Sequence, residues 1–263
     1  MIIGFSIFYY LNVPFETCKH HSCMRLSFML LLISLTISCK NDPASNESTT
    51  SAPVLPTKVL NAAFLVVDGV YNSELIAPMD VLHHTIFHTD PGVQVFLVGE
   101  RKDTITSFEG LKIIPDYAFS VDSIPPIDIF IVPSAAHSMD SDLENEELTA
   151  FVRRTGREAS YIMSLCDGAF VLANAGLLDT YECTTFPSDI DRFRKSFPDL
   201  KVHEQVSFVH DRKAITSAGG AKSYDPALFL VEHLYGKKVA DGIAKGLLIE
   251  WQLNEVKHIE VNR

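Results

Sequence analysis

Short apolar runs alternate with longer amphipathic segments along most of this 263-residue chain. The runs at residues 59–67, 93–100, 127–133 and 161–165 are almost continuously apolar, as strands buried on both faces of a parallel sheet are. Segments with helical spacing of apolar residues follow three of these runs. Parallel strands joined by helices form right-handed crossovers. We therefore predict an α/β fold, a three-layer α/β/α sandwich of flavodoxin-like type with a mostly parallel sheet.

The amino-terminal part of the chain has the pattern of an export signal. From Met24, the basic Arg25 is followed by an apolar run at residues 26–37 and then by Ser38 and Cys39. A cysteine directly after a small residue resembles the lipobox of bacterial lipoproteins, in which Cys39 would become the lipidated first residue. The apolar run is shorter than the roughly 20 residues that a membrane-spanning helix needs. A plain signal peptide or a membrane anchor is the alternative interpretation.

These patterns divide the chain into five parts. We expect residues 1–23 to lie upstream of the true start and residues 24–39 to form the lipoprotein-type signal peptide. Residues 40–57 are rich in Ser, Thr, Asn and Pro and should form a flexible linker. Residues 58–253 form the folded domain, and residues 254–263 a polar tail. The protein would then be held at the membrane by its amino-terminal lipid, in the bacterial cell envelope and facing the periplasm.

Charge and cysteine content exclude several classes of protein. The net charge of −11 argues against nucleic acid as a partner, because a phosphate-binding surface needs a basic face. The folded domain holds two of the five cysteines, Cys166 and Cys183, which is too few for a disulfide scaffold and lacks the spacing of a zinc site. We therefore expect no metal and no cofactor. His258 and Glu260 form a His-x-Glu motif, which we place in the polar tail, away from any site.

Cys166 lies between a predicted strand and a predicted helix, in the sequence SLCDG. A nucleophile elbow has this arrangement, because the tight turn pushes the side chain out of the sheet and aims the helix amino terminus at the reacting group. Backbone N–H groups at that end lower a thiol pKa and bind a developing oxyanion. Gly168 suits a turn in which a Cβ would crowd the neighbouring strand. A buried structural thiol is the alternative for Cys166 and the preferred interpretation for Cys183.

The segments at residues 166–187 and 214–236 resemble the DJ-1/PfpI superfamily, which has the class I glutamine-amidotransferase-like fold. The likeness is closer to its branch of isonitrile hydratases and AraC-type regulators. This resemblance implies that Cys166 is the elbow nucleophile. It also implies that Glu74, five residues after an Asp-Gly pair, hydrogen-bonds the sulfur and transfers a proton. From the residues alone, Glu74 is equally well explained as a partner of the helix dipole.

Three features depart from the family pattern. Phe186 replaces a histidine that many relatives carry, which puts a Cys-His-acid triad in doubt and makes His137 the candidate substitute. Ser134 and Ala135 replace two glycines whose loop supplies backbone donors in relatives. Asp167 replaces a threonine of the hydratase branch, and its charge would oppose a low thiol pKa unless it points away.

The resemblance and the residues together lead us to expect a cysteine-dependent hydratase or hydrolase that acts on a small molecule. Cys166 would attack, and Glu74 would transfer the proton. Backbone amides near Asp167, Gly168 and the 134–135 loop would bind the developing anion. A non-catalytic protein that senses redox state or binds a ligand is the alternative. The resemblance also implies a homodimer.

Overall fold

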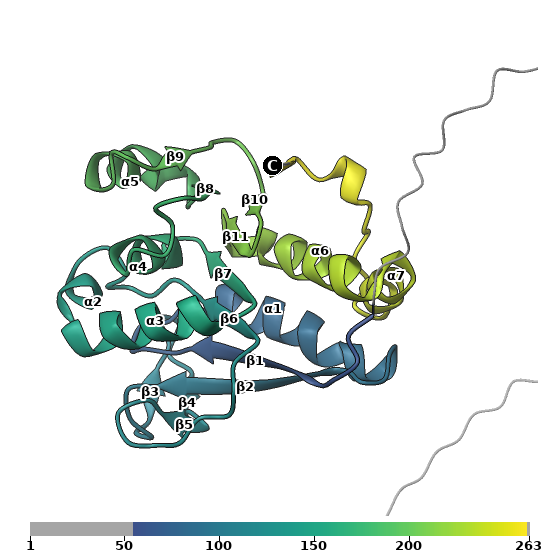
Figure 1. Ribbon diagram of the computed structural model, residues 1–263, viewed down its shortest axis with the longest axis horizontal. Helices are drawn as coiled ribbons and strands as arrows, with labels where there is room; N and C mark the ends of the chain where they lie inside the picture. The colour runs from purple at the N-terminus through teal and green to yellow at the C-terminus, as the bar shows by residue number, and fades with distance from the viewer. Residues whose placement is uncertain (1–54, 262–263) are drawn as a thin grey trace, which may run out of the picture. The chain divides into compact units, whose positions relative to one another are not determined.

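The structure, a computed structural model, describes residues 55–261, which lie within one compact unit, Thr50–Arg263. An eight-stranded sheet with the order β12-β10-β11-β7-β6-β1-β2-β5 forms its centre (Figure 1). Neighbouring strands are parallel except for the β10–β11 pair. The strands are β1 (Leu60–Leu65), β2 (Val93–Gly99), β5 (Tyr117–Ala118), β6 (Ile129–Val132), β7 (Tyr161–Leu165), β10 (Phe208–Asp211), β11 (Ala214–Ser217) and β12 (His258–Glu260).

Helices cover both faces of this sheet, which explains why its central strands are apolar along their length (Figure 1). One layer packs around Phe64 and Leu228, and the opposite layer packs around Phe151 and Phe170. The predicted three-layer α/β/α sandwich with a mostly parallel sheet is confirmed. The first layer consists of α1 (Asn72–His83), α6 (Tyr224–Tyr235) and α7 (Lys237–Gly246), and the second of α2 (Ser141–Glu144), α3 (Glu146–Glu158), α4 (Gly168–Asn174) and α5 (Ile190–Ser196).

Helix α3 illustrates how local signals in the sequence set the ends of a helix. The side chain of Asn145 caps its start by accepting a hydrogen bond from the N–H of Leu148 at 3.0 Å. Glu146 in the first turn and Arg157 in the last complement the helix dipole. The face that carries Leu148 and Phe151 is buried against the sheet, and this apolar contact fixes the helix in its layer.

Several short elements lie outside the central sheet. They give no periodic signal in the sequence, because two to four residues are too few for one. They are the antiparallel pair β3 (Ile105–Thr106) and β4 (Lys112–Ile113), the parallel pair β8 (Glu182–Cys183) and β9 (Lys201–Val202), and the 3-10 turns η1 (His84–Phe87), η2 (Pro187–Asp189), η3 (Gly220–Ser223) and η4 (Leu253–Glu255).

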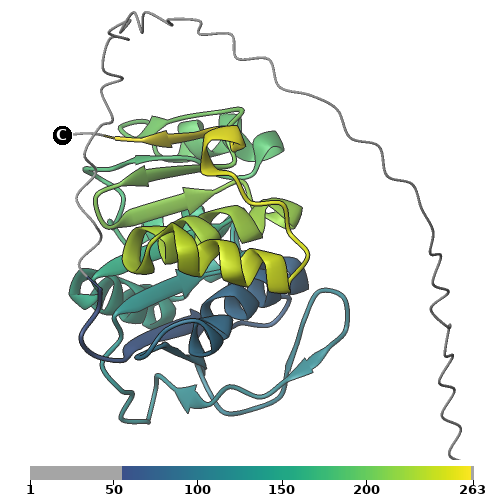
Figure 2. The same cartoon turned by 90° about the vertical axis from the view of Figure 1, so that its right-hand side faces the viewer.

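The carboxyl-terminal segment corrects one prediction. Residues 254–263 were expected to form a polar tail outside the sheet, but His258–Glu260 forms β12, the edge strand beside β10 (Figure 2). The N–H of Ser207 donates to the carbonyl of Lys257 at 2.7 Å, and the ring of Phe208 stacks on His258. An edge strand pairs with only one neighbour and has little buried surface. It can therefore carry His and Glu at alternate positions, and its sequence shows no apolar pattern that would identify it as a strand.

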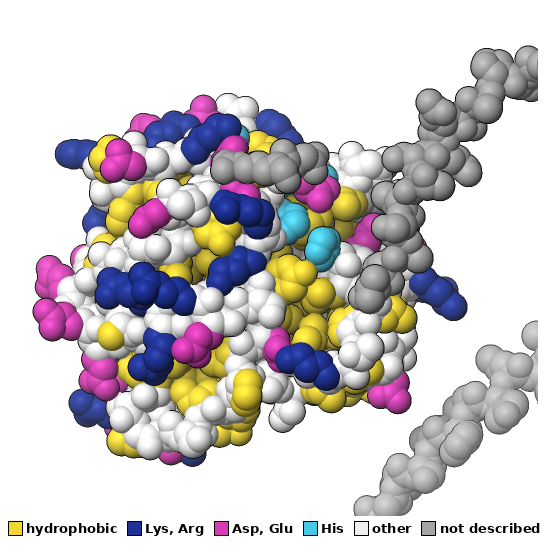
Figure 3. All heavy atoms as spheres, in the orientation of Figure 1, with side chains coloured by type: hydrophobic (Ala, Val, Ile, Leu, Met, Phe, Trp, Pro, Cys, Tyr) yellow, Lys and Arg dark blue, Asp and Glu magenta, His cyan; other side chains and the backbone are white. Residues whose placement is uncertain are grey.

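The surface of the folded domain carries charges of both signs (Figure 3). On the face in Figure 3, Lys and Arg side chains are interspersed with Asp and Glu side chains and do not gather into one basic patch. Within residues 55–261, no helix has the length and apolarity needed to cross a bilayer. The predicted signal peptide, Cys39 and almost all of the predicted linker lie outside the described residues.

Candidate active site

Cys166 occupies a sharp turn between β7 and α4, with a backbone φ of 53°. This left-handed conformation costs a non-glycine residue roughly 1–2 kcal/mol, so neighbouring groups must hold it. The N–H of Cys166 donates to the carbonyl of Ser217 at 3.0 Å, and its own carbonyl accepts from the hydroxyl of Thr185 at 3.1 Å. The turn has the strand–turn–helix geometry that the sequence SLCDG indicated.

Two glycines make this turn possible by letting the backbone pass close to its neighbours. A Cβ on Gly168 would lie 2.0 Å from the carbonyl oxygen of Val132, which explains the glycine two positions after the cysteine. Gly219, at φ 75°, passes so close to Cys166 that a Cβ there would lie 2.3 Å from the Cβ of the cysteine. Gly219 follows β11, and only the pairing of β11 with β7 brings it to the site.

Glu74 reaches the same site from the first turn of α1, and its side chain is buried. Its Oε1 accepts a hydrogen bond from the N–H of Gly220 at 2.8 Å, whereas Oε2 is buried and has no partner among the described residues. Burial raises the pKa of Glu74 despite the Gly220 hydrogen bond, and the charges of Glu109 and Asp167 raise it further. The carboxyl group is therefore biased toward its protonated form, with one oxygen free to donate.

Asp167 points toward the thiol instead of away from it. Its Oδ2 accepts a hydrogen bond from Cys166 Sγ at 3.6 Å, and its Oδ1 accepts one from the hydroxyl of Thr185 at 3.1 Å. Burial and the nearby charge of Asp189 raise the pKa of Asp167 to about 6, although the hydrogen bonds and Arg192 act in the opposite direction. This carboxylate is therefore a weak base beside the thiol, close to its titration range at neutral pH.

The thiol of Cys166 is kept protonated by its surroundings. Burial raises its pKa well above the ordinary range, and the carboxyl groups of Asp167 and Glu74 raise it further. The N–H of Asp167 lowers the pKa but does not outweigh these effects. Ser134 also lowers it as a neighbouring hydroxyl, although its Oγ makes no hydrogen bond of standard geometry with the described residues. A nucleophilic sulfur would therefore have to lose its proton during the reaction itself.

The loop after β6 lies beside the start of α1, and several of its hydrogen-bonding groups already have partners within the protein. The carbonyl of Ser134 accepts from the N–H of Tyr71 at 3.0 Å. The N–H of Ala135, expected to bind an oxyanion, instead donates to the hydroxyl of Ser138 at 2.8 Å. His137 is more than half exposed and pairs with Asp140, with 3.2 Å between Nδ1 and Oδ1. The N–H groups of Asp167 and Gly168 lie at the start of α4, where the first N–H groups of a helix have no partner within the helix.

Several residues of the site escaped the sequence analysis. Thr185, Ser217, Gly219 and Gly220 all contact Cys166, Asp167 or Glu74, yet each lies far from its partner along the chain. Their hydroxyl and glycine side chains are common in loops, so no local pattern distinguishes them. Their proximity to the cysteine could have been inferred only from the strand order.

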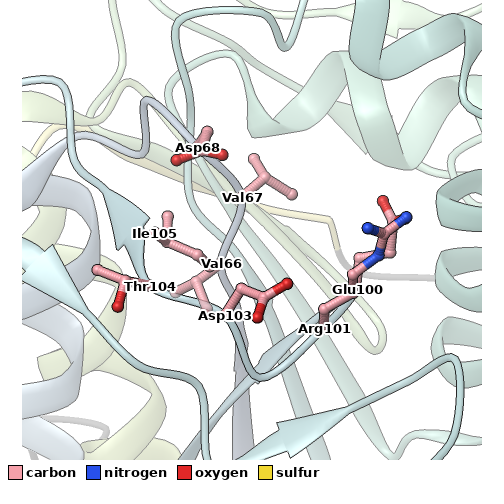
Figure 4. A pocket seen from close by; sticks show the side chains of 8 residues that line it. All are labelled: Val66, Val67, Asp68, Glu100, Arg101, Asp103, Thr104 and Ile105. Carbon is pink, nitrogen blue, oxygen red and sulfur yellow. The ribbon is translucent and has the colours of Figure 1, made fainter.

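A separate cavity of about 240 Å³ lies at the carboxyl ends of β1 and β2, and its lining does not include Cys166 (Figure 4). It has an acidic character from Asp68, Glu100 and Asp103, with Arg101 as a nearby cation. The acidic side chains stand apart in Figure 4. No group of three or more ligating side chains within residues 55–261 has a geometry that could hold a metal ion.

The chain is similar to several known proteins. The family model for the DJ-1/PfpI family matches residues 60–233. The chain is 32% identical over 181 residues to an isonitrile hydratase of Pseudomonas putida, which covers 69% of this chain and 75% of that enzyme. It is 29% identical over 153 residues to the HTH-type transcriptional regulator GbdR of Pseudomonas aeruginosa, covering 58% of this chain but 40% of the regulator.

Solved structures give the same picture of the fold. A ThiJ/PfpI family protein from Pseudomonas syringae aligns with a TM-score of 0.65 and 25% identity, over 80% of this chain and 83% of that one. DJ-1beta of Drosophila melanogaster aligns with a TM-score of 0.61 and 22% identity, over 74% of this chain and all of that one. The second likeness concerns the fold alone.

Proposed function

The chain belongs to the DJ-1/PfpI family, and on that premise we propose that it is a cysteine-dependent hydratase or hydrolase of a small molecule. The family contains enzymes, transcriptional regulators and DJ-1 proteins, so membership alone does not select a function. The observation that carries the proposal is Cys166 held at positive φ between two buried carboxyl groups, Glu74 and Asp167. A merely structural cysteine has no need of a strained backbone or of two buried acids.

We take an isonitrile as the first candidate substrate, because the isonitrile hydratase relative is similar over most of its length. The charge of the site supports a neutral molecule, since the carboxylate of Asp167 lies beside the thiol and would repel an anionic substrate. Beside them the rings of Tyr71 and Phe108 are 4.5 Å apart between centroids, and Phe108 is largely exposed. These rings would contact an apolar substituent of the substrate.

In the proposed reaction, the S–H bond of Cys166 breaks, a base beside the thiol takes its proton, and the sulfur forms a bond to the terminal carbon of the isonitrile. Glu74 gives its proton to that carbon, which yields a thioimidate bound to the enzyme. Water then adds to the same carbon, and Glu74 passes a water proton to the nitrogen. The C–S bond then breaks, and the sulfur regains its proton. The hydroxyl on the carbon gives its proton to Glu74, and its oxygen becomes the carbonyl oxygen of the released N-substituted formamide. The amides of Asp167 and Gly168 would stabilise negative charge that develops during these steps.

The alternative function is a non-catalytic one, in redox sensing or ligand binding. Oxidation of cysteine proceeds through the thiolate, and the raised pKa of Cys166 disfavours that form. This argument weighs against a peroxide sensor. A measurement of turnover distinguishes ligand binding from catalysis, because only an enzyme would convert the bound molecule to product.

The proposal is tested with purified protein and a panel of alkyl and aryl isonitriles. We expect consumption of the isonitrile and formation of one N-substituted formamide for each molecule consumed, followed by the amide carbonyl band or by chromatography. Heat-denatured protein provides the baseline. Saturable binding of the panel without product would contradict the hydratase and would favour the ligand-binding function.

We also propose that the protein is a lipoprotein of the bacterial cell envelope and a homodimer. The first part is supported by the export-signal pattern of residues 24–39 and the cysteine at its end, and the second by family membership. Metabolic labelling with a fatty acid should mark the native chain and not the Cys39→Ser variant. Sedimentation equilibrium of the folded domain should give twice the monomer mass.

A further inference from the structure

The carboxylate of Asp167 is held with one oxygen against the thiol. The hydroxyl of Thr185 lies 3.1 Å from both Asp167 Oδ1 and the carbonyl oxygen of Cys166, so it ties the aspartate to the turn that carries the cysteine. Oδ2 is thereby left facing Cys166 Sγ at 3.6 Å. Since Asp167 and Thr185 are both buried, this arrangement is shielded from competing water.

Other candidates to accept the thiol proton are less well placed. Burial raises the pKa of Glu74, which is the proton donor in the proposed reaction, and its carboxyl group accepts a hydrogen bond from the N–H of Gly220 and not from the thiol. His137 is exposed and paired with Asp140. The position where many relatives carry a histidine holds Phe186, which cannot accept a proton. Within residues 55–261, the side-chain acceptor hydrogen-bonded to the thiol is Asp167.

We propose that Asp167 is a catalytic base that accepts the thiol proton of Cys166 as the sulfur attacks the substrate. This inference rests on the proposed function for the identity of the electrophile. The S–H bond breaks while an O–H bond forms on Oδ2, and the sulfur lone pair forms the bond to the substrate carbon. When the C–S bond later breaks, the sulfur keeps the electron pair and recovers its proton from Asp167. Both residues thus return to their starting states.

The charges around Asp167 suit this role. A carboxyl group with a pKa of about 6 is mostly ionised at pH 7 and is a stronger base than an ordinary aspartate. The groups that act on it are Asp189 and Arg192, near the start of α5, together with Thr185 and Cys166. The charge of Asp167 in turn raises the pKa of Glu74. Asp189 raises the pKa of Asp167, so its removal should move the titration to lower pH.

The first test measures alkylation of Cys166 by iodoacetamide at pH 7, with the site assigned by mass spectrometry. If Asp167 takes the proton, Asp167→Asn should react at least tenfold more slowly than the native protein. If Asp167 acts only through its charge, the same substitution should favour the thiolate and speed the reaction, which would overturn the proposal. Because Asn keeps the shape and removes a buried charge, this variant should fold, and thermal unfolding verifies that it does.

The second test follows kcat/KM against pH with the isonitrile panel. The native profile should rise with an apparent pKa near 6, and Asp167→Asn should lose about 10²–10⁴-fold in kcat/KM together with this rise. Asp189→Asn should keep the plateau but shift the rise to lower pH, a change that a merely structural aspartate would not produce. An unchanged profile in both variants would refute the role of Asp167. If native protein shows no turnover while alkylation still slows in Asp167→Asn, the proposed function fails and the proton transfer stands.

Discussion

Cys166→Ser is expected to lower kcat for isonitrile hydration by at least about 10³-fold while leaving the fold intact. Serine has nearly the same shape, so the turn held by Ser217 and Thr185 should persist. Its hydroxyl is a much weaker acid than a thiol, and Asp167 with a pKa of about 6 is too weak a base to activate it. Product formation measured at saturating substrate, with circular dichroism to verify folding, gives the comparison.

Cys183→Ser is the matched control for this result. Cys183 is buried in β8, and burial raises its pKa to about 12, so it resembles Cys166 in its environment. Its thiol donates to the backbone carbonyl of Lys201 at 3.9 Å, an acceptor that cannot serve as a base. Turnover should therefore survive this substitution. Comparable loss in both variants would indicate that a general loss of packing, and no specific chemistry of Cys166, explains the effect.

Gly168→Ala is expected to destabilise the protein by roughly 3 kcal/mol or more, the largest effect on stability of any single methyl group that we anticipate. The added Cβ would lie 2.0 Å from the carbonyl oxygen of Val132 and 3.2 Å from the carbonyl carbon of Pro133. Both neighbours are backbone atoms, one in the last residue of β6 and one in the residue after it, and they cannot rotate away. Urea unfolding at constant pH measures the change in free energy of unfolding.

Gly246→Ala serves as the control for the glycine experiment. Gly246 ends α7, and a Cβ added there meets no atom within 4 Å. Alanine also favours a helix over glycine, so the change in free energy should be small or slightly stabilising. If Gly168→Ala proved as mild as this control, the close packing of α4 against β6 would have to be more adaptable than the structure indicates.

The sequence predicts the central strands and the turn well because their signals are local. A continuous apolar run identifies β6 and β7, and the glycine of SLCDG identifies the close approach after Cys166. Helix ends were less accurate. Apolar residues continue after Cys166 through Leu178, but α4 ends at Asn174, shortly before Gly176 at φ 70°. A single glycine in an apolar segment is too weak a signal to locate the end of a helix.

The environment of the thiol could not be predicted in the same way. Asp167 is adjacent to Cys166 in sequence, but its orientation depends on Thr185, which a different part of the chain supplies. The N–H that binds Glu74 comes from Gly220, 146 positions further along the chain. Such contacts depend on strand order and on the paths of loops, and neither leaves a mark in a single sequence. The strand β12 was missed for the same reason.

Both ends of the central sheet finish in very short strands. β5 contributes two residues, Tyr117–Ala118, and β12 contributes three, His258–Glu260. A long, flat edge strand offers unpaired N–H and C=O groups to other chains and invites aggregation, whereas a short edge with charged side chains does not. The last residues of the chain therefore act as a cover for β10. Ending the protein at residue 253 would uncover that strand and create a site for intermolecular strand addition.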